Sequence, residues 1–253
     1  MLENTSHIMK DKHIIITGAS SGLGKNLAIK ASFAGAKVTL VARDKCRLLD
    51  TIHKMYNKDK HSIYSSDLSN LNEIESLLKN IVSNNGKIDG FCHCAGVTGS
   101  AAIRPIKVSN TNFVDSIFKI HVLAFIEAVR VLSLPKVTNS GANIVGISSV
   151  VAYRGEVGCS SYAAAKGAVD SFVKNAAVEL YNRKIKINSV AFGTINSETY
   201  LNMVEEDFDK LHVMGNQKFG GIDLDNATDI LISLLSNKSL QYTGNTIEFF
   251  AGR

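Results

Sequence analysis

The sequence predicts an α/β fold in which a parallel sheet of about seven strands is covered by helices on both faces. Short β-branched runs alternate with longer helical patterns along the chain. The first such run, at residues 12–17, leads into a glycine-rich turn and then into an amphipathic helical pattern. With 253 residues the chain is long enough for a large core, and we expect one domain over residues 1–253.

The alternation assigns each segment in turn. The expected strands are residues 12–17, 37–42, 62–66, 88–93, 142–148, 185–191 and 246–250. The expected helices are residues 22–33, 45–57, 71–84, 111–132, 161–181, 199–213 and 226–235. Right-handed crossovers between such elements give a doubly wound, Rossmann-type sheet. Ligands then bind beyond the carboxyl ends of the strands, which is where the two motifs described next fall.

The glycine-rich turn has the features of a phosphate-binding loop. It reads Gly18-Ala19-Ser20-Ser21-Gly22-Leu23-Gly24, after an apolar run at residues 13–16. Glycine permits a tight turn and a close approach of backbone to a pyrophosphate, and a helix N-terminus offers unpaired N–H groups. The spacing is G-x-x-x-G-x-G rather than G-x-G-x-x-G. Between a strand and a helix, this pattern favours a dinucleotide-binding loop over a glycine loop without a ligand.

Ser149, Tyr162 and Lys166 form the second motif. Tyr162 and Lys166 are four residues apart, a spacing that places both side chains on one face of a helix. An ammonium beside a phenol favours the phenolate, so we expect a pKa for Tyr162 below its usual value. Such a tyrosine can exchange a proton with a carbonyl or alcohol oxygen that a serine hydroxyl also bonds. By itself the spacing is weak, because it also occurs where a lysine stem lies along a ring.

With both motifs, the chain resembles the short-chain dehydrogenase/reductase family from about residue 10 to the C-terminus. The run TGASSGLG at residues 17–24 matches the family's cofactor loop. Ser149, Tyr162 and Lys166 match its catalytic serine, tyrosine and lysine, including the separation between serine and tyrosine. The resemblance also implies a substrate flap at about residues 192–222.

Two further segments match the family pattern. Asp67 and Leu68 match the pair that holds the adenine ring, and Cys94-Ala95-Gly96 stands where the family usually has Asn-Ala-Gly. The cofactor-binding residues that we expect are Gly18, Ser20, Ser21, Gly22, Leu23, Gly24, Arg43, Asp67, Leu68, Cys94, Ala95, Gly96, Tyr162, Lys166 and, through its backbone, Ile195.

The end of the second expected strand bears on the choice of cofactor. This strand end reads the adenosine ribose, and an acidic residue there would favour NAD. Here Ala42 stands at that place and is followed by Arg43, whose guanidinium can fork onto a 2′-phosphate. We therefore expect NADP(H), with NAD(H) as the alternative, since Ser21 stands where many NADP-dependent members have a second basic residue. The less favoured alternative for Arg43 is a surface arginine paired with Asp44 or Asp50.

The resemblance implies a reaction in which Tyr162 protonates a ketone oxygen, Ser149 holds that oxygen, and Lys166 lowers the tyrosine pKa and bonds the nicotinamide ribose. We expect an NADP-dependent oxidoreductase that acts on a ketone or secondary alcohol, with a 3-oxoacyl thioester as the first candidate substrate. The alternative is a member with weakened catalysis that binds the cofactor as a redox sensor or scaffold.

Two positions depart from the family pattern. His121 stands where an asparagine commonly holds a proton-relaying water, and it either replaces that asparagine or only packs in its helix. Phe192 stands where proline usually precedes glycine, and we expect it to be a packing residue rather than one that frees the flap. The C-terminal run at residues 249–252 also differs from the usual Asp-Gly-Gly ending.

Flap residues and the segment before Tyr162 predict a mostly apolar substrate pocket. The expected lining residues are Val151, Tyr153, Val157, Ser197, Tyr200, Met203 and Phe208. The partner is then a small-molecule carbonyl substrate, and the resemblance implies a homotetramer or homodimer in which the helices beginning at Thr111 and Ser161 pack across a two-fold axis.

Composition argues against other classes of function. The net charge of +5 comes from scattered Lys and Arg, which favours solvated surface over a nucleic-acid patch. No apolar run approaches the roughly 20 residues that span a bilayer, and residues 1–10 have no signal-peptide core. Cys92-His93-Cys94 has no second pair to complete a metal site, so we expect no metal. The four cysteines fit reduced thiols of a cytoplasmic enzyme.

Overall fold

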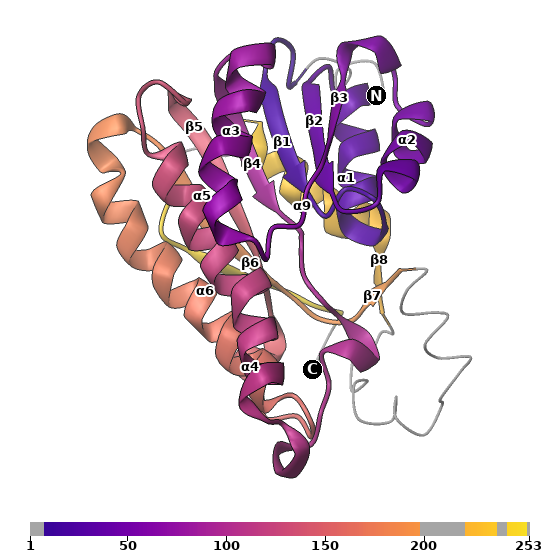
Figure 1. Ribbon diagram of the computed structural model, residues 1–253, viewed down its shortest axis with the longest axis vertical. Coiled ribbons are helices and arrows are strands. Elements are labelled where there is room, and N and C mark those ends of the chain that lie inside the picture. The colour runs from indigo at the N-terminus through magenta and orange to yellow at the C-terminus, as the bar shows by residue number, and fades with distance from the viewer. Residues whose placement is uncertain (1–7, 198–220, 237–241, 252–253) are drawn as a thin grey trace.

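A seven-stranded sheet lies between two layers of helices in the computed structural model, which describes residues 8–197, 221–236 and 242–251 (Figure 1). The strands of this sheet are β1 (His13–Thr17), β2 (Lys37–Ala42), β3 (Ser62–Ser65), β4 (Ile88–His93), β5 (Thr138–Ser149), β6 (Lys186–Phe192) and β9 (Thr246–Phe249). They pair in the order β3-β2-β1-β4-β5-β6-β9, and every pair is parallel. The predicted doubly wound, Rossmann-type sheet is confirmed.

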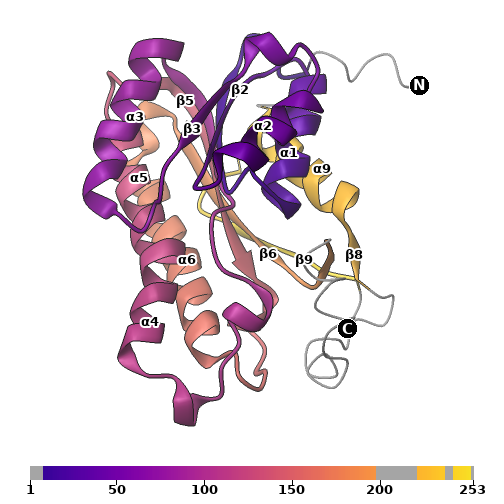
Figure 2. The ribbon, with the colours of Figure 1, turned by 45° about the vertical axis from the view of Figure 1, so that its right-hand side comes forward.

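The helices cover both faces of the sheet. They are α1 (Gly22–Phe33), α2 (Lys45–His53), α3 (Leu71–Asn85), α4 (Thr111–Phe118), α5 (Ala124–Leu132), α6 (Ser160–Glu179) and α9 (Leu224–Leu235). In Figure 2, α3, α4, α5 and α6 lie on one side of the sheet, and α1, α2 and α9 lie on the other. Within the described ranges, no helix combines the length and apolarity needed to cross a bilayer.

Strand β1 shows why its short apolar sequence forms a central strand. All five of its residues are buried, and successive side chains point to opposite faces. Ile15 belongs to the core beneath α3, α5 and α6, whereas Ile14 and Ile16 belong to the core beneath α1 and α9. A strand buried on both faces needs apolar residues at consecutive positions, which is the pattern HIIIT supplies. Each buried isoleucine contributes about 1.5–3 kcal/mol of hydrophobic stabilisation.

The direction in which the sheet is wound reverses between β1 and β4. From β1 the chain moves outward to β2 and β3, and from β4 it moves outward to β5, β6 and β9. The connecting helices therefore diverge at this point and leave a crevice beyond the carboxyl ends of the two strands. Gly18 follows β1 and Cys94 follows β4, so two of the predicted cofactor segments flank the crevice.

Several element boundaries differ from the sequence expectations. The helix expected at residues 111–132 is divided by a π-helical turn at Lys119–Leu123, which contains His121. The helix expected to reach residue 57 ends at His53, and Asn57 has a positive φ of 51°. Strand β5 begins at Thr138 rather than at residue 142, through a register irregularity opposite Ile88 and Gly90.

The segment after β6 contains a small second sheet that the sequence did not predict. In it, β7 (Ile195–Asn196) pairs in parallel with β8 (Ile222–Asp223). Asp223 then accepts a hydrogen bond of 2.7 Å from the Asp225 N–H and caps α9. The helix expected at residues 199–213 and most of the expected flap lie outside the described residues.

Candidate active site

A cavity of about 1000 Å³ opens at the carboxyl ends of the strands. All of the expected cofactor and catalytic residues line it, although they come from eight separate segments of the sequence. The convergence arises because the carboxyl ends of parallel strands meet at one edge of a sheet. The described part of the chain therefore places the glycine loop, Arg43, Asp67 and the Ser149–Lys166 motif around one space.

The glycine loop is shaped by close backbone packing. A Cβ on Gly18 would lie 2.8 Å from the Ala95 nitrogen, and one on Gly24 would lie 2.4 Å from the Gly18 oxygen. Gly22 has a φ of 48°, and a Cβ there would meet no heavy atom within 4 Å. The side chain of Ser21 makes no capping hydrogen bond, so the first N–H groups of α1 remain available at the cavity wall. Open space at a helix N-terminus fits the pyrophosphate of a dinucleotide.

Thr17 joins the two strand ends that flank the crevice. Its hydroxyl accepts a 3.2 Å hydrogen bond from the Ala95 N–H and lies 3.1 Å from Nδ1 of His93. The other ring nitrogen of His93 lies 2.9 Å from the carbonyl oxygen of Ile120. This chain of contacts links the glycine loop to the π-helical turn. Sequence analysis did not single out Thr17 or His93 for this role, because their partners are distant in sequence.

An acid and two arginines line the cavity beyond the ends of β2 and β3. The carboxylate of Asp67 accepts hydrogen bonds from the N–H and hydroxyl of Ser69, at 2.9 and 2.8 Å. The backbone bond from Ser69 chiefly lowers the pKa of Asp67, and the charge of Arg43 lowers it further. Arg43 and Arg47 both line the cavity. Arg47, which the sequence analysis missed, is one turn into α2.

The alternative pairing proposed for Arg43 is not present. Asp44 instead caps α2, since its carboxylate accepts a 3.0 Å hydrogen bond from the Arg47 N–H. Among the described residues, Arg43 forms no salt bridge within 4.0 Å.

Tyr162 lies in the first turn of α6 with its hydroxyl hydrogen-bonded to Ser149. Ser149 ends β5, and its hydroxyl also lies 3.3 Å from the carbonyl oxygen of Phe192, to which it can donate. Burial raises the pKa of Tyr162 well above its usual value, and the bond to Ser149 only partly opposes this. The expectation of a lowered tyrosine pKa is therefore wrong for this structure, because desolvation of the phenolate outweighs the contribution of Ser149.

Lys166 is buried one turn after Tyr162, with its ammonium 5.3 Å from the centre of the tyrosine ring. The ammonium donates a 2.8 Å hydrogen bond to the carbonyl oxygen of Ile147 rather than to the phenol. Burial lowers the pKa of Lys166 to about 8, while the negative charge of Asp170 acts in the opposite direction. Lys166 can therefore gain or lose its proton at a pH only slightly above neutral.

Asp170 joins α6 to the neighbouring strands through hydrogen bonds. Its carboxylate accepts hydrogen bonds from Ser148, Ser189 and Tyr153, at 2.7, 2.6 and 2.5 Å. These donors come from β5, from β6 and from the segment between β5 and α6. The buried carboxylate therefore fixes α6 against the strand that ends in Ser149. The sequence spacing of Lys166 and Asp170 could have suggested a shared helix face, but not these partners.

His121 is brought to the site by the π-helical turn. Its ring meets the ring of Tyr162 edge-on at 5.4 Å, and Nε2 contacts the backbone of Val97. Burial, together with the charge of Lys166, holds the pKa of His121 well below its usual range, so the ring is neutral. Among the described residues, Nδ1 is a buried atom without a hydrogen-bond partner. The ring also fills the space that a Cβ on Gly96 would occupy.

The model of the short chain dehydrogenase family matches residues 12–207 of this sequence. The chain belongs to the short-chain dehydrogenase family. It is therefore an oxidoreductase of a family that uses nicotinamide cofactors, and the fit of the glycine loop to a pyrophosphate agrees with that membership.

Relatives of the chain include several named dehydrogenases and reductases. It is 31% identical to dehydrogenase/reductase SDR family member 7B of Danio rerio, over 91% of this chain and 76% of that protein. It is 28% identical to carbonyl reductase family member 4 of Xenopus laevis, over 81% of this chain and 84% of that protein. It is 25% identical to the 3-oxoacyl-(acyl-carrier-protein) reductase FabG of Staphylococcus epidermidis, over 96% of this chain and 98% of that protein.

Solved structures agree on the fold. A short-chain dehydrogenase/reductase from Serratia marcescens superposes with a TM-score of 0.87 at 21% identity, covering 97% of this chain and 99% of that one. A dehydrogenase/reductase from Sinorhizobium meliloti gives a TM-score of 0.86 at 21% identity, covering 97% of this chain and 96% of that one.

Two departures from the short-chain dehydrogenase pattern are accommodated by packing. Phe192 is buried, lines the cavity and meets the ring of Phe249 edge-on at 5.9 Å. Phe249 comes from the unusual C-terminal run, so the two substituted positions pack against each other. Cys94 replaces the usual asparagine, with its sulfur 3.5 Å from that of Cys92. No group of three or more His, Cys, Asp or Glu suited to a metal occurs in the described ranges.

In this short-chain dehydrogenase, the segment expected to line an apolar pocket gives a more polar lining than the sequence predicted. Val151 and Ser197 line the cavity as expected, but Tyr153 and Val157 do not. Tyr153 turns to Asp170, and Val157 is 74% exposed. The remaining expected pocket residues, Tyr200, Met203 and Phe208, lie outside the described part of the chain. The segment before α6 instead contributes Arg154, Gly155, Glu156 and Cys159 to the lining.

Proposed function

We propose that this enzyme transfers hydride between NADP(H) and a ketone or secondary alcohol. One observation carries the proposal: Ser149, Tyr162 and Lys166 line the same cavity as the glycine loop. Burial keeps Tyr162 protonated at neutral pH, as a proton donor in ketone reduction must be. The cofactor and catalytic roles of the individual residues are part of this proposal.

A nicotinamide cofactor held at this site would supply the hydride for the carbonyl carbon, or accept it in the reverse direction. Tyr162 donates a proton to the carbonyl oxygen, so that a hydride and a proton together convert the ketone to the alcohol. Ser149 holds that oxygen, since its hydroxyl already bonds Tyr162. Lys166 stabilises the phenolate left behind and, with a pKa of about 8, can pass on the replacement proton. The cavity wall orients the reactants and limits access of water.

Two arginines support NADP(H) over NAD(H). Arg43 and Arg47 line the adenosine end of the cavity, and Arg43 has no salt-bridge partner among the described residues. The 2′-phosphate of NADP(H) would be a salt-bridge partner for Arg43 through a charge-assisted, forked hydrogen bond. Ala42 provides no carboxylate that would repel this phosphate.

His121 is proposed to act in the proton relay behind Tyr162. Its neutral ring touches the tyrosine, and Nδ1 is free to bond a water. His121→Asn should preserve turnover, because asparagine can also bond water, whereas His121→Phe should lower kcat more than it raises KM. Equal turnover in wild type and His121→Phe would mean that the ring serves only as packing.

The main experiment follows NADPH absorbance with a panel of ketones, in wild type, Tyr162→Phe and a control. Tyr56→Phe is the matched control, because Tyr56 is 54% exposed and does not line the cavity. Wild type and the control should oxidise NADPH, and Tyr162→Phe should lose about 10²–10⁴-fold in kcat while retaining cofactor binding. Undiminished oxidation by Tyr162→Phe would refute its role as proton donor.

A second candidate function is a cofactor-binding redox sensor or scaffold with weak catalysis. It is favoured by the bond from Lys166 to Ile147 and by Cys94 at the usual asparagine position. Cofactor binding without turnover across a broad ketone panel would support this function and exclude the reductase.

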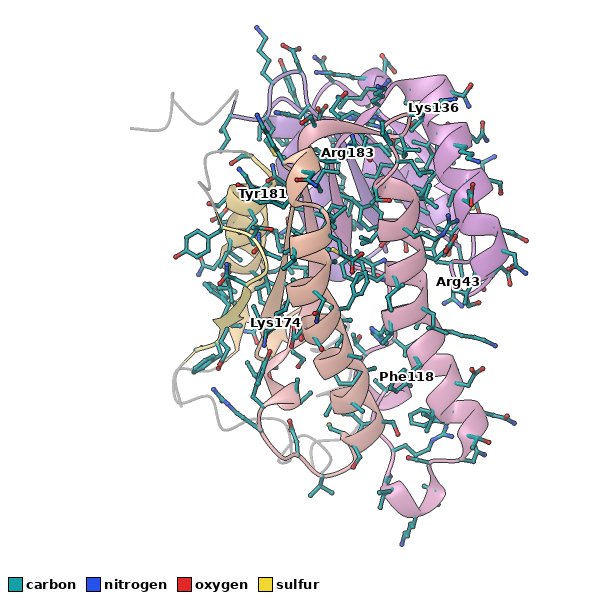
Figure 3. The ribbon with its side chains drawn as sticks, turned by 90° about the vertical axis from the view of Figure 1, so that its left-hand side faces the viewer. Arg43, Phe118, Lys136, Lys174, Tyr181 and Arg183 are labelled. Atoms are coloured by element: carbon teal, nitrogen blue, oxygen red, sulfur yellow. The ribbon has the colours of Figure 1, made fainter. Side chains whose placement is uncertain are left out.

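Several finer assignments belong to the same proposal. A 3-oxoacyl thioester is the first substrate to test, given the relative from Staphylococcus epidermidis. We propose one domain over residues 1–253, and a cytoplasmic location on the basis of four free cysteines. A homodimer or homotetramer would cover the exposed apolar side chains Leu123, Val178 and Tyr181. Figure 3 shows the outer face of the α4–α6 layer, with Phe118 and Tyr181 labelled toward its two ends.

A further inference from the structure

Several buried polar atoms without hydrogen-bond partners belong to residues that line the cavity. Four buried side-chain nitrogen or oxygen atoms lack a hydrogen-bond partner in the described part of the chain: His121 Nδ1, Thr138 Oγ1, Arg154 Nη2 and Glu156 Oε1. Three of these belong to residues that line the cavity, and Thr138 is the exception. Buried polar groups are normally hydrogen-bonded, so such a concentration at a binding site calls for partners that a bound molecule would supply.

Glu156 differs from the other groups because it is a carboxylate; its side chain is half-buried, with Oε1 shielded from solvent. Within the described residues it forms no salt bridge within 4.0 Å. Burial raises the pKa of Glu156, and no neighbouring charge contributes to that shift. An acceptor that remains buried without a donor destabilises the folded protein, so its presence in a cavity wall indicates a function there.

The backbone around Glu156 is held in place on both sides. Its carbonyl oxygen accepts a 3.2 Å hydrogen bond from the Cys159 N–H, immediately before α6. The carbonyl oxygen of Gly158 accepts a 2.8 Å bond from the Arg104 N–H, which ties the segment to the residue after Ile103, another lining residue. On the other side, Tyr153 is bonded to Asp170. Glu156 is therefore presented from a fixed segment that ends at the helix bearing Tyr162.

We propose that Glu156 selects carbonyl substrates that carry a hydrogen-bond donor, either a hydroxyl or an N–H group, which its carboxylate accepts. This inference deepens the proposed function and depends on it, because it assigns the substrate class of the same site. A donor on the substrate satisfies the orphan oxygen on binding. An apolar substrate of the same shape leaves it unsatisfied, and a substrate with an anionic group there is repelled.

The test compares three ketones of similar shape: 4-methylcyclohexanone, 4-hydroxycyclohexanone and 4-aminocyclohexanone. Each is assayed by NADPH oxidation with wild type, Glu156→Gln, Glu156→Leu and Val157→Ala. Val157 is the matched control, because it adjoins Glu156 but is exposed and lies outside the cavity lining. Thermal unfolding of each variant checks that it is folded.

Wild type and Val157→Ala should favour the hydroxyl or amino ketone over the methyl ketone by about tenfold or more in kcat/KM. Glu156→Leu should abolish or reverse this ratio. Glu156→Gln distinguishes the two donors: it should retain a preference for the hydroxyl ketone, since its amide oxygen still accepts, but lose a preference for the ammonium. A wild-type ratio that is the same in Glu156→Leu would overturn the proposal.

A binding measurement separates failure of this inference from failure of the proposed reaction. Calorimetric titration of the hydroxyl and methyl ketones into wild type and Glu156→Leu, with NADP present, needs no turnover. Selective binding of the hydroxyl ketone that Glu156→Leu loses supports Glu156 even if no ketone is reduced. Turnover of all three ketones with no selectivity in either assay leaves the reductase intact and refutes the role of Glu156.

Discussion

The hydroxyl of Ser148 donates a 2.7 Å hydrogen bond to the carboxylate of Asp170, one turn along α6 from Lys166. Ser148 precedes Ser149, so this bond connects the strand that presents the serine to the helix that presents the tyrosine and lysine. The same carboxylate favours the charged form of Lys166. Asp170 thus contacts the surroundings of two members of the proposed catalytic group without lining the cavity, and we propose that it is a positioning residue.

Asp170→Asn should shift the pH dependence of ketone reduction. The carboxylate raises the pKa of Lys166, so its neutralisation should lower that pKa from about 8. Protonated lysine is then lost at a lower pH, and the alkaline fall in kcat/KM should begin earlier. The pH profile of the variant measures this, with Glu179→Gln as an exposed control on the same helix. An unmoved alkaline limb would show that Asp170 does not act through Lys166.

Arg43→Ala should weaken the binding of NADPH more than the binding of NADH. Loss of a charge-assisted bond to the 2′-phosphate, worth about 1.5–3 kcal/mol, corresponds to a rise of about tenfold or more in the dissociation constant of NADPH. The dissociation constant of NADH, which lacks that phosphate, should change little. Fluorescence titration of both cofactors checks this, and Lys45→Ala removes a nearby positive charge outside the cavity lining. Equal losses for NADPH and NADH would place Arg43 elsewhere on the dinucleotide.

Gly24→Ala should destabilise the protein more than Gly22→Ala. A Cβ at position 24 would meet the backbone of Gly18, which cannot move without distorting the glycine loop, and overpacking of this kind costs about 1–3 kcal/mol. A Cβ at position 22 enters open space, and its cost is the backbone strain of a positive φ, about 1 kcal/mol. Thermal unfolding compares the two. A larger loss for Gly22→Ala would show that strain outweighs packing in this loop.

Lys166→Met should abolish turnover but stabilise the fold. A pKa of about 8 instead of the ordinary 10.5 corresponds to a penalty of about 3 kcal/mol for the buried charge. Loss of the bond to Ile147 removes about 1 kcal/mol of that gain.

The stability gain from Lys166→Met should depend on pH. In wild type the penalty is full below pH 8 and disappears as the pH rises toward 10.5, because the unfolded chain binds the proton more tightly there. Urea unfolding at pH 7 and pH 10 measures the difference between the two proteins. A gain that does not shrink with pH would mean that packing, not charge burial, sets it.

The amino-acid sequence by itself determined the fold class and the location of the site. The run HIIIT, the glycine turn and the helical spacing of Tyr162 and Lys166 are local patterns, and local patterns set strands, turns and helix faces. Parallel strands then force their carboxyl ends together, so residues as distant as Gly18, Asp67 and Tyr162 could be expected around one cavity.

Tertiary structure alone decided the chemistry within that cavity. Burial decides that the pKa of Tyr162 is raised rather than lowered. The ammonium of Lys166 donates its hydrogen bond to the Ile147 carbonyl rather than to the phenol. Tyr153, expected in an apolar pocket, bonds Asp170 instead, and Glu156 lines the cavity. Desolvation and hydrogen-bond partnership are properties of the three-dimensional surroundings of a group, and neighbours in sequence do not specify them.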